Sequence, residues 1–143
     1  IIPVEFLNFN PDKKVRIRFS LMPQVVSDEL EPNTPAIIDR IKAVDAFIDA
    51  GYEVHLNFSP VIVYENWLKD YEFLFQMCND YIDYKDEVKG EVLLWTPHNQ
   101  ESKVSSYGGT NVRYKRNLKN NYIESFVSLH DRIINWNKIR YIF

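Results

Sequence analysis

Hydrophobic and polar positions alternate strictly in two stretches of the chain, residues 14–20 and 51–60. The alternating hydrophobic residues are Val15, Ile17 and Phe19 in the first stretch and Val54, Leu56 and Phe58 in the second. A period of two places successive side chains on opposite faces of a pleated strand, so both stretches are predicted to be β-strands. The first should end at Ser20, and the second after Ser59, because Pro60 cannot continue a strand's hydrogen bonding.

Three other segments repeat hydrophobic residues at helical spacing. They are Ile37, Ile41, Val44 and Ile48; Leu68, Tyr71, Phe75, Cys78 and Ile82; and Leu118, Tyr122, Phe126, Leu129 and Ile133. This spacing predicts amphipathic helices over 35–50, 67–84 and 117–134.

The first predicted helix carries its own start and stop signals. Thr34 is expected to cap free N–H groups, with Pro35 at the first helical position and Gly51 ending the helix in a left-handed conformation. Its charged residues, Arg40 among them, are assigned to the side away from the hydrophobic stripe. The preceding residues 21–35 form a long connection, and loops of that length inside compact domains tend to be functional.

Two further strands, 87–94 and 138–143, complete an alternating series of strands and helices. Such a series predicts an α/β fold with a parallel sheet, either part of a barrel or an open sheet. In such folds ligands bind at the carboxyl ends of the strands. Ser20, Asn57 and Ser59 lie there and are the candidate cofactor-binding residues, and the alternative is a polar strand end that only faces solvent.

Composition and charge narrow the classes of protein that remain. The chain has 143 residues, with 17 basic and 20 acidic side chains and a formal charge of −3. We expect one domain over 1–143, and a nucleic-acid partner would need a local basic patch. A single cysteine and no apolar run of about 18 residues favour a cytoplasmic protein without a membrane partner. Ile1-Ile2-Pro3 contains neither an initiator methionine nor a signal-peptide pattern, which suggests a longer polypeptide.

Familiar catalytic motifs are missing from the sequence. His55, His98 and His130 lack metal-ligand spacing, and the chain has neither a nucleophile elbow nor a phosphate-binding glycine-rich loop. Cys78 falls on the hydrophobic stripe of its helix, so we expect a packed thiol rather than a ligand or nucleophile. No metal site is predicted within the chain.

The segment 95–116 is polar, rich in turn formers and predicted to be a loop or hairpin insertion. Cationic side chains that neutralise phosphates are interleaved there with aromatic ones that stack on bases. They are Lys103, Tyr107, Arg113, Tyr114, Lys115, Arg116 and Lys119. Gly108 and Gly109 fit a hairpin turn. The segment is the candidate DNA-binding site, and the alternative is a solvated helix start beside a loop.

A series of short motifs also recurs in a known order and spacing. The motifs are Arg16-Ile17-Arg18-Phe19-Ser20, Leu30-Glu31-Pro32-Asn33-Thr34, Arg40, Ala50-Gly51-Tyr52, Ser59-Pro60, Glu65-Asn66-Trp67, Asp70-Tyr71, Leu94-Trp95-Thr96-Pro97, Gln100-Glu101-Ser102-Lys103, Tyr107-Gly108-Gly109 and Asn111-Val112-Arg113-Tyr114. They resemble the spore photoproduct lyase family of radical S-adenosylmethionine (SAM) enzymes, and the later ones its broader, lyase-like branch.

The resemblance implies a DNA-repair lyase that reverts the thymine dimer called spore photoproduct. It also implies a partial (β/α)6 barrel, of which this chain would be the C-terminal half. In the family a [4Fe-4S] cluster reduces SAM to a 5′-deoxyadenosyl radical, which abstracts a hydrogen from the lesion. The implied partners are damaged DNA, SAM and the missing N-terminal half of the polypeptide.

Individual residues carry parts of this resemblance. Ser20 matches the strand-end serine that faces SAM, and Ser59 matches a position, usually alanine, whose backbone meets the adenine. The segment from Tyr107 to Tyr114 resembles a hairpin that meets lesion DNA, with Arg113 as its cation. The stretch Tyr64-Glu65-Asn66-Trp67 departs at two places from the family's His-Glu-Gly-Trp.

The largest departure from the family is a missing cysteine run. Three cysteines spaced Cys-x-x-x-Cys-x-x-Cys must hold the cluster, because thiolates ligate the irons, and this chain has one. We therefore expect the catalytic residues on the N-terminal half, SAM and the [4Fe-4S] cluster to be held only by the full-length protein, and no activity from this chain alone. The rival classes are a non-catalytic nucleic-acid-binding module and a small-molecule α/β barrel enzyme, and cysteines upstream in the complete gene would favour the lyase.

The chain is also expected to be interrupted between Val92 and Leu93. The residues before this point resemble the start of a family strand, and those after it resemble the far side of a longer segment. If these two parts are joined directly, too few residues remain to form the longer segment. A wide gap between the two Cα atoms would indicate a missing loop, since a trans peptide holds them at about 3.8 Å.

Overall fold

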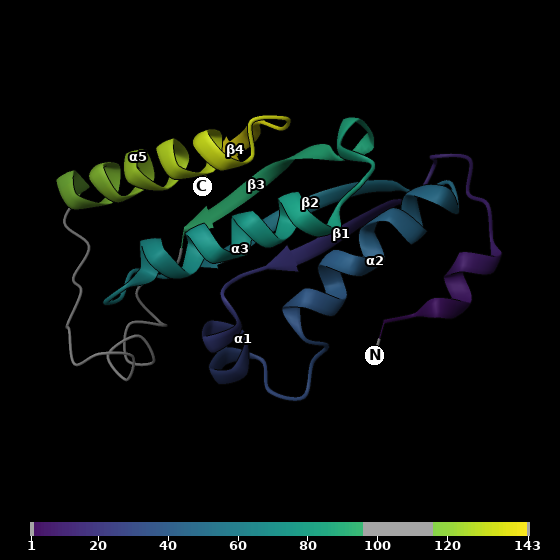
Figure 1. Ribbon diagram of the computed structural model, residues 1–143, viewed down its shortest axis with the longest axis horizontal. Helices are drawn as coiled ribbons and strands as arrows, with labels where there is room; N and C mark the ends of the chain where they lie inside the picture. Colours follow the sequence, from purple (N-terminus) through teal and green to yellow (C-terminus); the bar gives the residue numbers. More distant parts are fainter. Residues whose placement is uncertain (1, 96–115, 143) are drawn as a thin grey trace.

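The computed structural model describes residues 2–95 and 116–142 of the chain (Figure 1). The strands are β1 (Arg16–Leu21), β2 (Glu53–Val61), β3 (Lys89–Trp95) and β4 (Ile139–Ile142). The α-helices are α1 (Gln24–Leu30), α2 (Ile37–Asp49), α3 (Trp67–Tyr81) and α5 (Arg116–Ile133), and the short 3-10 helices are η1 (Val4–Asn8) and η2 (Lys85–Glu87). All four predicted strands and all three predicted helices are confirmed, with shifted ends.

The four strands form one parallel sheet in the order β1-β2-β3-β4. Helices α1 and α2 connect β1 to β2, α3 connects β2 to β3, and α5 connects β3 to β4. Each helical connection therefore returns the chain to the neighbouring position in the sheet, as crossovers between parallel strands usually do. The predicted α/β fold with a parallel sheet is confirmed.

Helices α2, α3 and α5 pack on the same face of this sheet (Figure 1). The ring of Phe47 in α2 lies 5.7 Å from that of Phe19 in β1. In β2, the ring of Phe58 lies 5.3 Å from Phe75 in α3 and 6.0 Å from Phe126 in α5. The hydrophobic positions of the strands thus face the helices, and the alternating polar positions face the other way.

The connection 21–35 contains a helix, α1, that the sequence patterns did not predict. The predicted cap at Thr34 is wrong, because α2 begins after Ala36. Ala36 is the N-cap residue, and its side chain makes no hydrogen bond to the helix. Instead Gln24 Oε1 in α1 accepts a hydrogen bond of 2.8 Å from the Ile37 N–H. A side chain thirteen residues away therefore satisfies one of the free donors at the start of α2.

The expectations at the two ends of the central strand had different outcomes. Gly51 has a φ of +98°, so the predicted positive-φ stop after α2 is confirmed. The predicted end at Ser59 is wrong, because β2 continues through Pro60 to Val61. The pairing of β2 with β3 is irregular between Phe58 and Val61. A proline is tolerated there because a bulged section does not need every N–H of the strand.

The predicted interruption between Val92 and Leu93 is also wrong. Both residues lie inside β3, where Val92 pairs with Asn57 and Leu93 pairs with Phe58. Consecutive residues of β3 thus face consecutive residues of β2, which requires a continuous backbone. No longer segment is inserted at this point of the chain.

His130, near the end of α5, packs in the aromatic core and provides a pH test. Burial lowers its pKa below the ordinary value, and Asp131, 3.0 Å from Nδ1, opposes that shift. Because an unfolded histidine has a pKa of about 6.5, the unfolded chain binds more protons just below that pH. His130 therefore contributes stability that is present above about pH 6.5 and is lost as the pH falls toward the folded pKa.

We expect the urea midpoint of the wild type to fall between pH 7.5 and pH 5.5, and that of His130→Leu to fall less. The comparison removes the imidazole and keeps an apolar side chain at the site. An equal fall in both proteins would show that His130 is not responsible.

Candidate functional site

The polar residues of β1 and β2 form a ladder on the sheet face opposite the helices. In the register of the two strands Arg16 pairs with Glu53, Arg18 with His55, and Ser20 with Asn57. Paired residues of parallel strands in register share a face. No described helix covers this face within residues 2–95 and 116–142 (Figure 1).

The end of this ladder at the carboxyl ends of the strands holds the three predicted cofactor-binding residues. Ser20 and Asn57 are direct neighbours, and Ser59 follows two residues further along β2. All three residues are half-buried. The predicted position of Ser20 and Ser59 at the carboxyl ends of parallel strands is confirmed, the two strands are neighbours in the sheet, and the role of these residues in binding stays a prediction.

Asn57 carries an unusual feature within this group. Its side-chain oxygen Oδ1 is buried and accepts no hydrogen bond from residues 2–95 or 116–142. Leaving a buried acceptor unpaired costs about 1–3 kcal/mol, so such atoms are rare and call for an explanation. A ligand that donates a hydrogen bond at the carboxyl edge of the sheet would supply one.

At the other end of the ladder, where the two strands begin, charged side chains pair with one another. Glu53 accepts a hydrogen bond of 3.2 Å from Arg16 Nε and lies 3.1 Å from His55 Nε2. The hydrogen bond to His55 is the main reason that the pKa of Glu53 lies below its ordinary value, and Arg16 adds to the effect. Arg16, one of the basic residues of this strand face, is therefore paired with an acidic residue of the same sheet.

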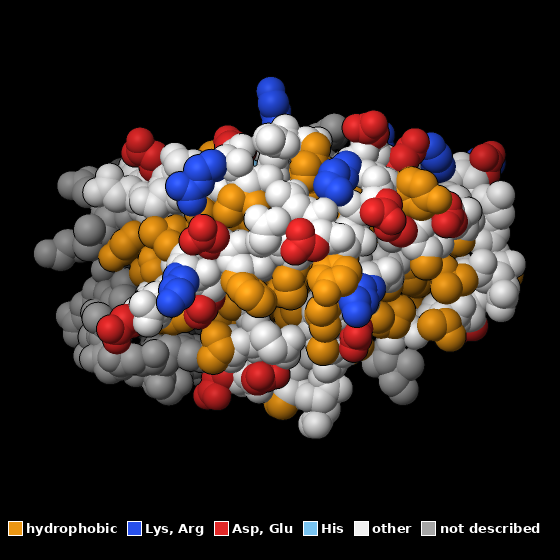
Figure 2. Space-filling view, viewed as in Figure 1, with side chains coloured by type: hydrophobic (Ala, Val, Ile, Leu, Met, Phe, Trp, Pro, Cys, Tyr) orange, Lys and Arg blue, Asp and Glu red, His pale blue; other side chains and the backbone are white. Residues whose placement is uncertain are grey.

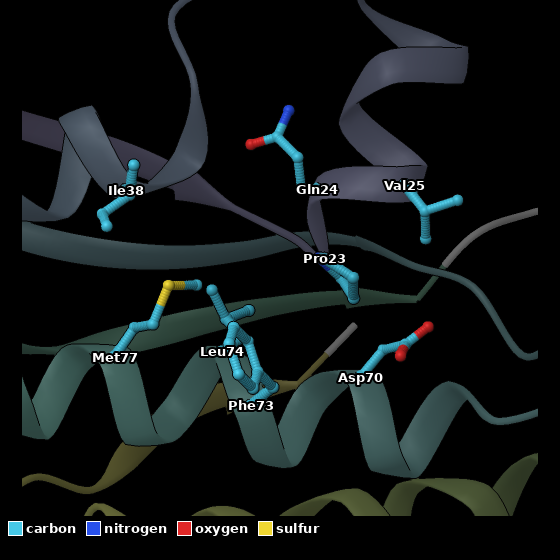
Figure 3. Close-up of a pocket in the computed structure, with 8 residues that line it drawn as sticks. All are labelled: Pro23, Gln24, Val25, Ile38, Asp70, Phe73, Leu74 and Met77. Atoms are coloured by element: carbon cyan, nitrogen blue, oxygen red, sulfur yellow. The ribbon is translucent and has the colours of Figure 1, made fainter.

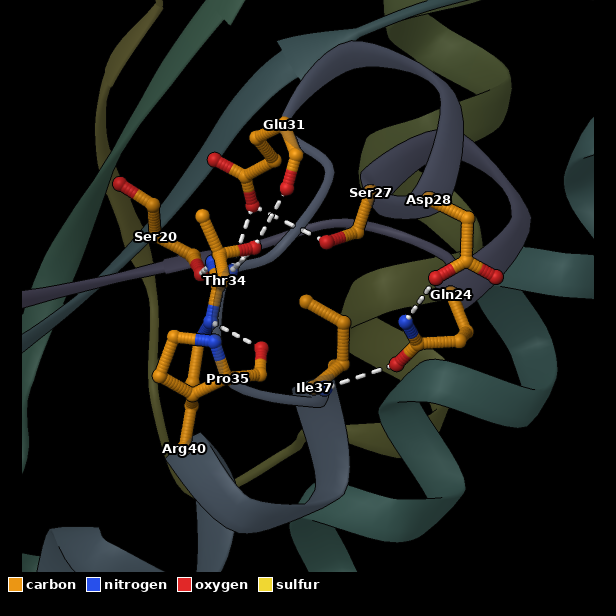
Figure 4. A network of polar contacts seen from close by, with 9 residues as sticks. All are labelled: Ser20, Gln24, Ser27, Asp28, Glu31, Thr34, Pro35, Ile37 and Arg40. Carbon is orange, nitrogen blue, oxygen red and sulfur yellow. Dashed lines mark hydrogen bonds and ion pairs between the residues drawn. The ribbon is translucent and has the colours of Figure 1, made fainter. Parts of the chain in front are cut away.

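Arg40 is buried, which corrects its assignment to the polar side of α2. Its Nη1 donates to the Ser20 carbonyl at 2.9 Å and its Nε to the Pro35 carbonyl at 3.1 Å (Figure 4). Its Nη2 lies 2.6 Å from Glu31 Oε1 and 2.9 Å from Thr34 Oγ1. Arg40 therefore joins the carboxyl end of β1 to the segment 31–35.

The sequence contained a signal for this burial that the helix assignment did not use. Arg40 is three residues after Ile37 and four before Val44, so it lies beside the hydrophobic stripe of α2. An acid, Glu31, is close enough in sequence to pair with it. A charged residue beside the stripe with a nearby opposite charge is a candidate buried ion pair.

A groove on the helix side of the molecule is less suited to a polar ligand. It has a volume of about 470 Å³ and lies between α1, α2 and α3 (Figure 3). Hydrophobic side chains are frequent on this face, with charged residues scattered around them (Figure 2). Its polar lining is already engaged: Asp70 accepts from the Tyr64 hydroxyl, and Gln24 bonds Ile37 and Asp28.

The loop 64–67 keeps a defined conformation. Asn66, where the resemblance led us to expect glycine, has a φ of +66° and precedes α3. Asparagine is among the few residues that adopt this left-handed region readily. Tyr64, where the resemblance led us to expect histidine, is 6% exposed and donates its hydroxyl to Asp70 at 2.9 Å. Both residues are thus compatible with an ordered loop.

Cys78 is fully buried in α3, which confirms the predicted packed thiol. Burial raises its pKa to about 12, so it stays protonated and is a poor metal ligand. Across residues 2–95 and 116–142, no cluster of three or more His, Cys, Asp or Glu side chains is arranged to hold a metal ion. In the same residues no helix is long and apolar enough to span a membrane.

The predicted DNA-binding residues lie outside the described part of the chain. They are Lys103, Tyr107, Gly108, Gly109, Arg113, Tyr114 and Lys115. Of the predicted insertion 95–116, the first residue ends β3 and the last begins α5. The hairpin and its basic patch therefore stay predictions.

Fold and site together define an α/β protein with a parallel sheet and a polar carboxyl edge. A sequence model described as Spore photoproduct lyase matches residues 4–94, which is more than half of the chain. The chain belongs to the spore photoproduct lyase family.

Two curated relatives match part of the chain. A spore photoproduct lyase of Clostridium acetobutylicum is 32% identical over 82 residues, covering 57% of this chain and 24% of the relative. One of Bacillus subtilis is 33% identical over 63 residues, covering 44% of this chain and 18% of the relative. The matched region thus spans about a quarter or less of each relative.

Solved structures of spore photoproduct lyase variants share the fold. One, with dinucleoside spore photoproduct, has a TM-score of 0.72 at 16% identity and covers 92% of this chain and 46% of that chain. Another, with bound AdoMet and dinucleoside spore photoproduct, has a TM-score of 0.64 at 16% identity, covering 90% and 44%. The chain spans slightly less than half the length of these proteins.

Proposed function

We propose that the chain is the C-terminal part of a radical SAM DNA-repair lyase that reverts the spore photoproduct, acting in the cytoplasm. The observation that carries the proposal is the buried, unpaired oxygen of Asn57 beside Ser20, at the ligand-binding edge of the sheet. Membership of the spore photoproduct lyase family supports it. A structural neighbour whose title names both AdoMet and the lesion supports it further.

The sheet topology supports a place in a partial (β/α)6 barrel. In a barrel the strands follow sequence order and every helix lies outside, so the inner face of the sheet has no helix against it. The described chain has the order β1-β2-β3-β4 and helices on one face. We therefore propose that the Ser20–Asn57 face lines the interior, and that another part of the polypeptide completes the barrel.

The polar groups at the carboxyl edge of the sheet fit SAM, whose hydroxyl, amino and ammonium groups donate hydrogen bonds. Asn57 Oδ1 is an acceptor for one of these donors, the Ser20 hydroxyl can donate or accept, and Ser59 offers its backbone. When bound and reductively cleaved, SAM supplies the 5′-deoxyadenosyl radical. The contribution of these three residues is to hold the cofactor at the edge of the sheet, in a fixed orientation toward the lesion.

The [4Fe-4S] cluster does not fit the residues of this chain. The sequence has one cysteine, and its thiol is buried with a raised pKa. The cluster ligands must therefore come from a part of the enzyme outside these 143 residues, and we propose that the catalytic residues come from there too. We propose that SAM and the cluster are held by the complete enzyme, to which this chain contributes the carboxyl edge of the sheet, and that this chain alone holds neither and does not catalyse the reaction.

SAM binding to the complete protein tests the proposed site directly. In equilibrium dialysis we expect Asn57→Leu to weaken SAM binding at least about tenfold, or about 1.4 kcal/mol, because the isosteric side chain removes the acceptor. Asn121→Leu makes the same chemical change at an exposed position of α5 and should bind like the wild type. A complete wild-type protein without affinity for SAM, or equal affinity in Asn57→Leu, would reject the assignment.

We also propose that the cationic and aromatic segment contacts damaged DNA. Arg113→Ala should weaken binding to a duplex containing the lesion by about 1–3 kcal/mol if Arg113 meets a base or phosphate. Lys69→Ala removes an exposed cation from α3 and should have little effect. The measurement is a fluorescence-anisotropy titration of the complete protein over a salt series. Unchanged affinity of Arg113→Ala at every salt concentration would remove Arg113 from the interface.

A further inference from the structure

We propose that Arg40 is a positioning residue for the carboxyl edge of the sheet. It holds the end of β1 against the segment 31–35, so that Ser20 stays beside Asn57 for the ligand bound there. This inference rests on the proposed function, because it concerns the same site. Arg40 itself contacts only protein groups among the described residues.

The guanidinium group makes the connection through all three of its nitrogen atoms. Its side chain is 11% exposed. The Nη1 atom bonds the backbone of β1 at the Ser20 carbonyl, and Nε bonds the backbone at the Pro35 carbonyl (Figure 4). A planar group with fixed N–H directions can satisfy several acceptors at once, whereas a lysine ammonium is a point charge. The separation between Ser20 and the segment is therefore set by a rigid side chain.

Glu31 completes the connection and is itself oriented. Its Oε1 lies 2.6 Å from Arg40 Nη2 and accepts a hydrogen bond of 3.1 Å from the Ser27 hydroxyl. Thr34 accepts from Arg40 at 2.9 Å and donates to the Glu31 carbonyl at 2.7 Å. The network thus pairs a buried cation with a carboxylate and closes the segment 31–35 on itself. Breaking such a pair leaves a charge without its partner, which costs more than a lost surface contact.

Among the described residues, the network contacts the site through the backbone carbonyl of Ser20. The Ser20 side chain belongs to the ladder with Asn57, while the Ser20 carbonyl is held by Arg40. Removing the guanidinium leaves Ser20, Asn57 and Ser59 chemically unchanged but frees the strand end that carries Ser20. The expected effect is weaker ligand binding without the loss of any ligand-binding side chain.

Two measurements on the complete protein test this role. The first is SAM affinity by equilibrium dialysis, and the second is amide hydrogen exchange of residues 20–22 and 31–37. We expect Arg40→Gln to weaken SAM binding at least fivefold and to speed exchange in these segments at least tenfold. Thr34→Val, which keeps the ion pair and removes one hydroxyl, should show smaller changes of the same kind.

Val44→Ala is the matched control, because Val44 is fully buried one turn further along α2. It lowers stability without touching the network, so SAM affinity should stay within twofold at a temperature where both variants are folded. A similar loss of affinity in Val44→Ala and Arg40→Gln would reduce Arg40 to a stability role and overturn the proposal.

The remaining outcomes separate this proposal from the proposed function. Faster exchange in Arg40→Gln with unchanged SAM affinity would overturn the positioning role and leave SAM binding intact. Unchanged exchange in both segments would overturn the connection itself. Should the complete wild-type protein fail to bind SAM, the proposed function fails and the positioning role fails with it, whatever the exchange data show about the connection.

Discussion

Replacing Phe75 by alanine is expected to lower the free energy of unfolding by about 3–5 kcal/mol. Phe75 is fully buried in α3. Its ring lies 5.3 Å from that of Phe58 in β2, 5.4 Å from Phe126 in α5 and 5.8 Å from Tyr71. It thus joins the central strand to two helices, and its removal leaves a cavity that rigid neighbouring rings cannot fill.

The same helix supplies a matched control for this substitution. Phe73 is two residues earlier in α3 and 70% exposed. Phe73→Ala should change stability by no more than about 0.5 kcal/mol, because most of its surface is already in water. Urea unfolding of both variants, followed by circular dichroism, gives the comparison. Similar losses in the two variants would mean that α3 is packed in a different orientation.

Gly51→Ala is expected to cost about 2–4 kcal/mol of stability. Gly51 has a φ of +98°, and a Cβ built there would lie 2.1 Å from Asn10 Oδ1. Backbone strain at such a φ costs about 1–3 kcal/mol. Moving Asn10 also disturbs its hydrogen bond of 3.0 Å from the Asp12 N–H, worth about 0.5–1.5 kcal/mol. These costs fall at the turn where α2 leads into the central strand β2.

Ala50→Gly is the control for Gly51→Ala. Ala50 ends α2 with a φ of −74° and a ψ of −7°, which any residue adopts. Glycine there should cost only about 0.5–1 kcal/mol through the entropy of the unfolded chain. Thermal unfolding of the two variants provides the measurement. Equal costs would show that the backbone at Gly51 does not require glycine.

The strand-end rule found the three candidate cofactor-binding residues, but it could not find the residue that bonds the backbone of one of them. Ser20, Asn57 and Ser59 follow from alternation and from the place where parallel strands bind ligands. Arg40 was assigned to a polar helix face, and although its place beside the hydrophobic stripe and the nearby Glu31 indicated burial, nothing in the sequence indicated its bond to Ser20. Its bond to the Ser20 carbonyl joins positions twenty residues apart. Such a contact depends on the path of the chain between them.

Local sequence patterns also failed to predict the structure of the connecting segment and the contacts at the start of α2. The helix α1 occupies a connection that was expected to be irregular, and its Gln24 satisfies the Ile37 N–H where Thr34 was expected to act. The Thr34 hydroxyl instead bonds Glu31 and Arg40. Capping rules describe which side chains can satisfy a helix end, whereas competing acceptors brought close by folding decide which one does.

The sequence by itself determined the four strands, the helices α2, α3 and α5, the fold class and the burial of Cys78. Alternation and helical spacing are local properties, because they reflect which side of a strand or helix faces the core. The tertiary structure alone decided that Ser20 pairs with Asn57, that Asn57 Oδ1 has no donor among the described residues, and that Arg40 is buried. Each of these depends on distances between residues remote in the chain, which only the packing of the helices against the parallel sheet sets.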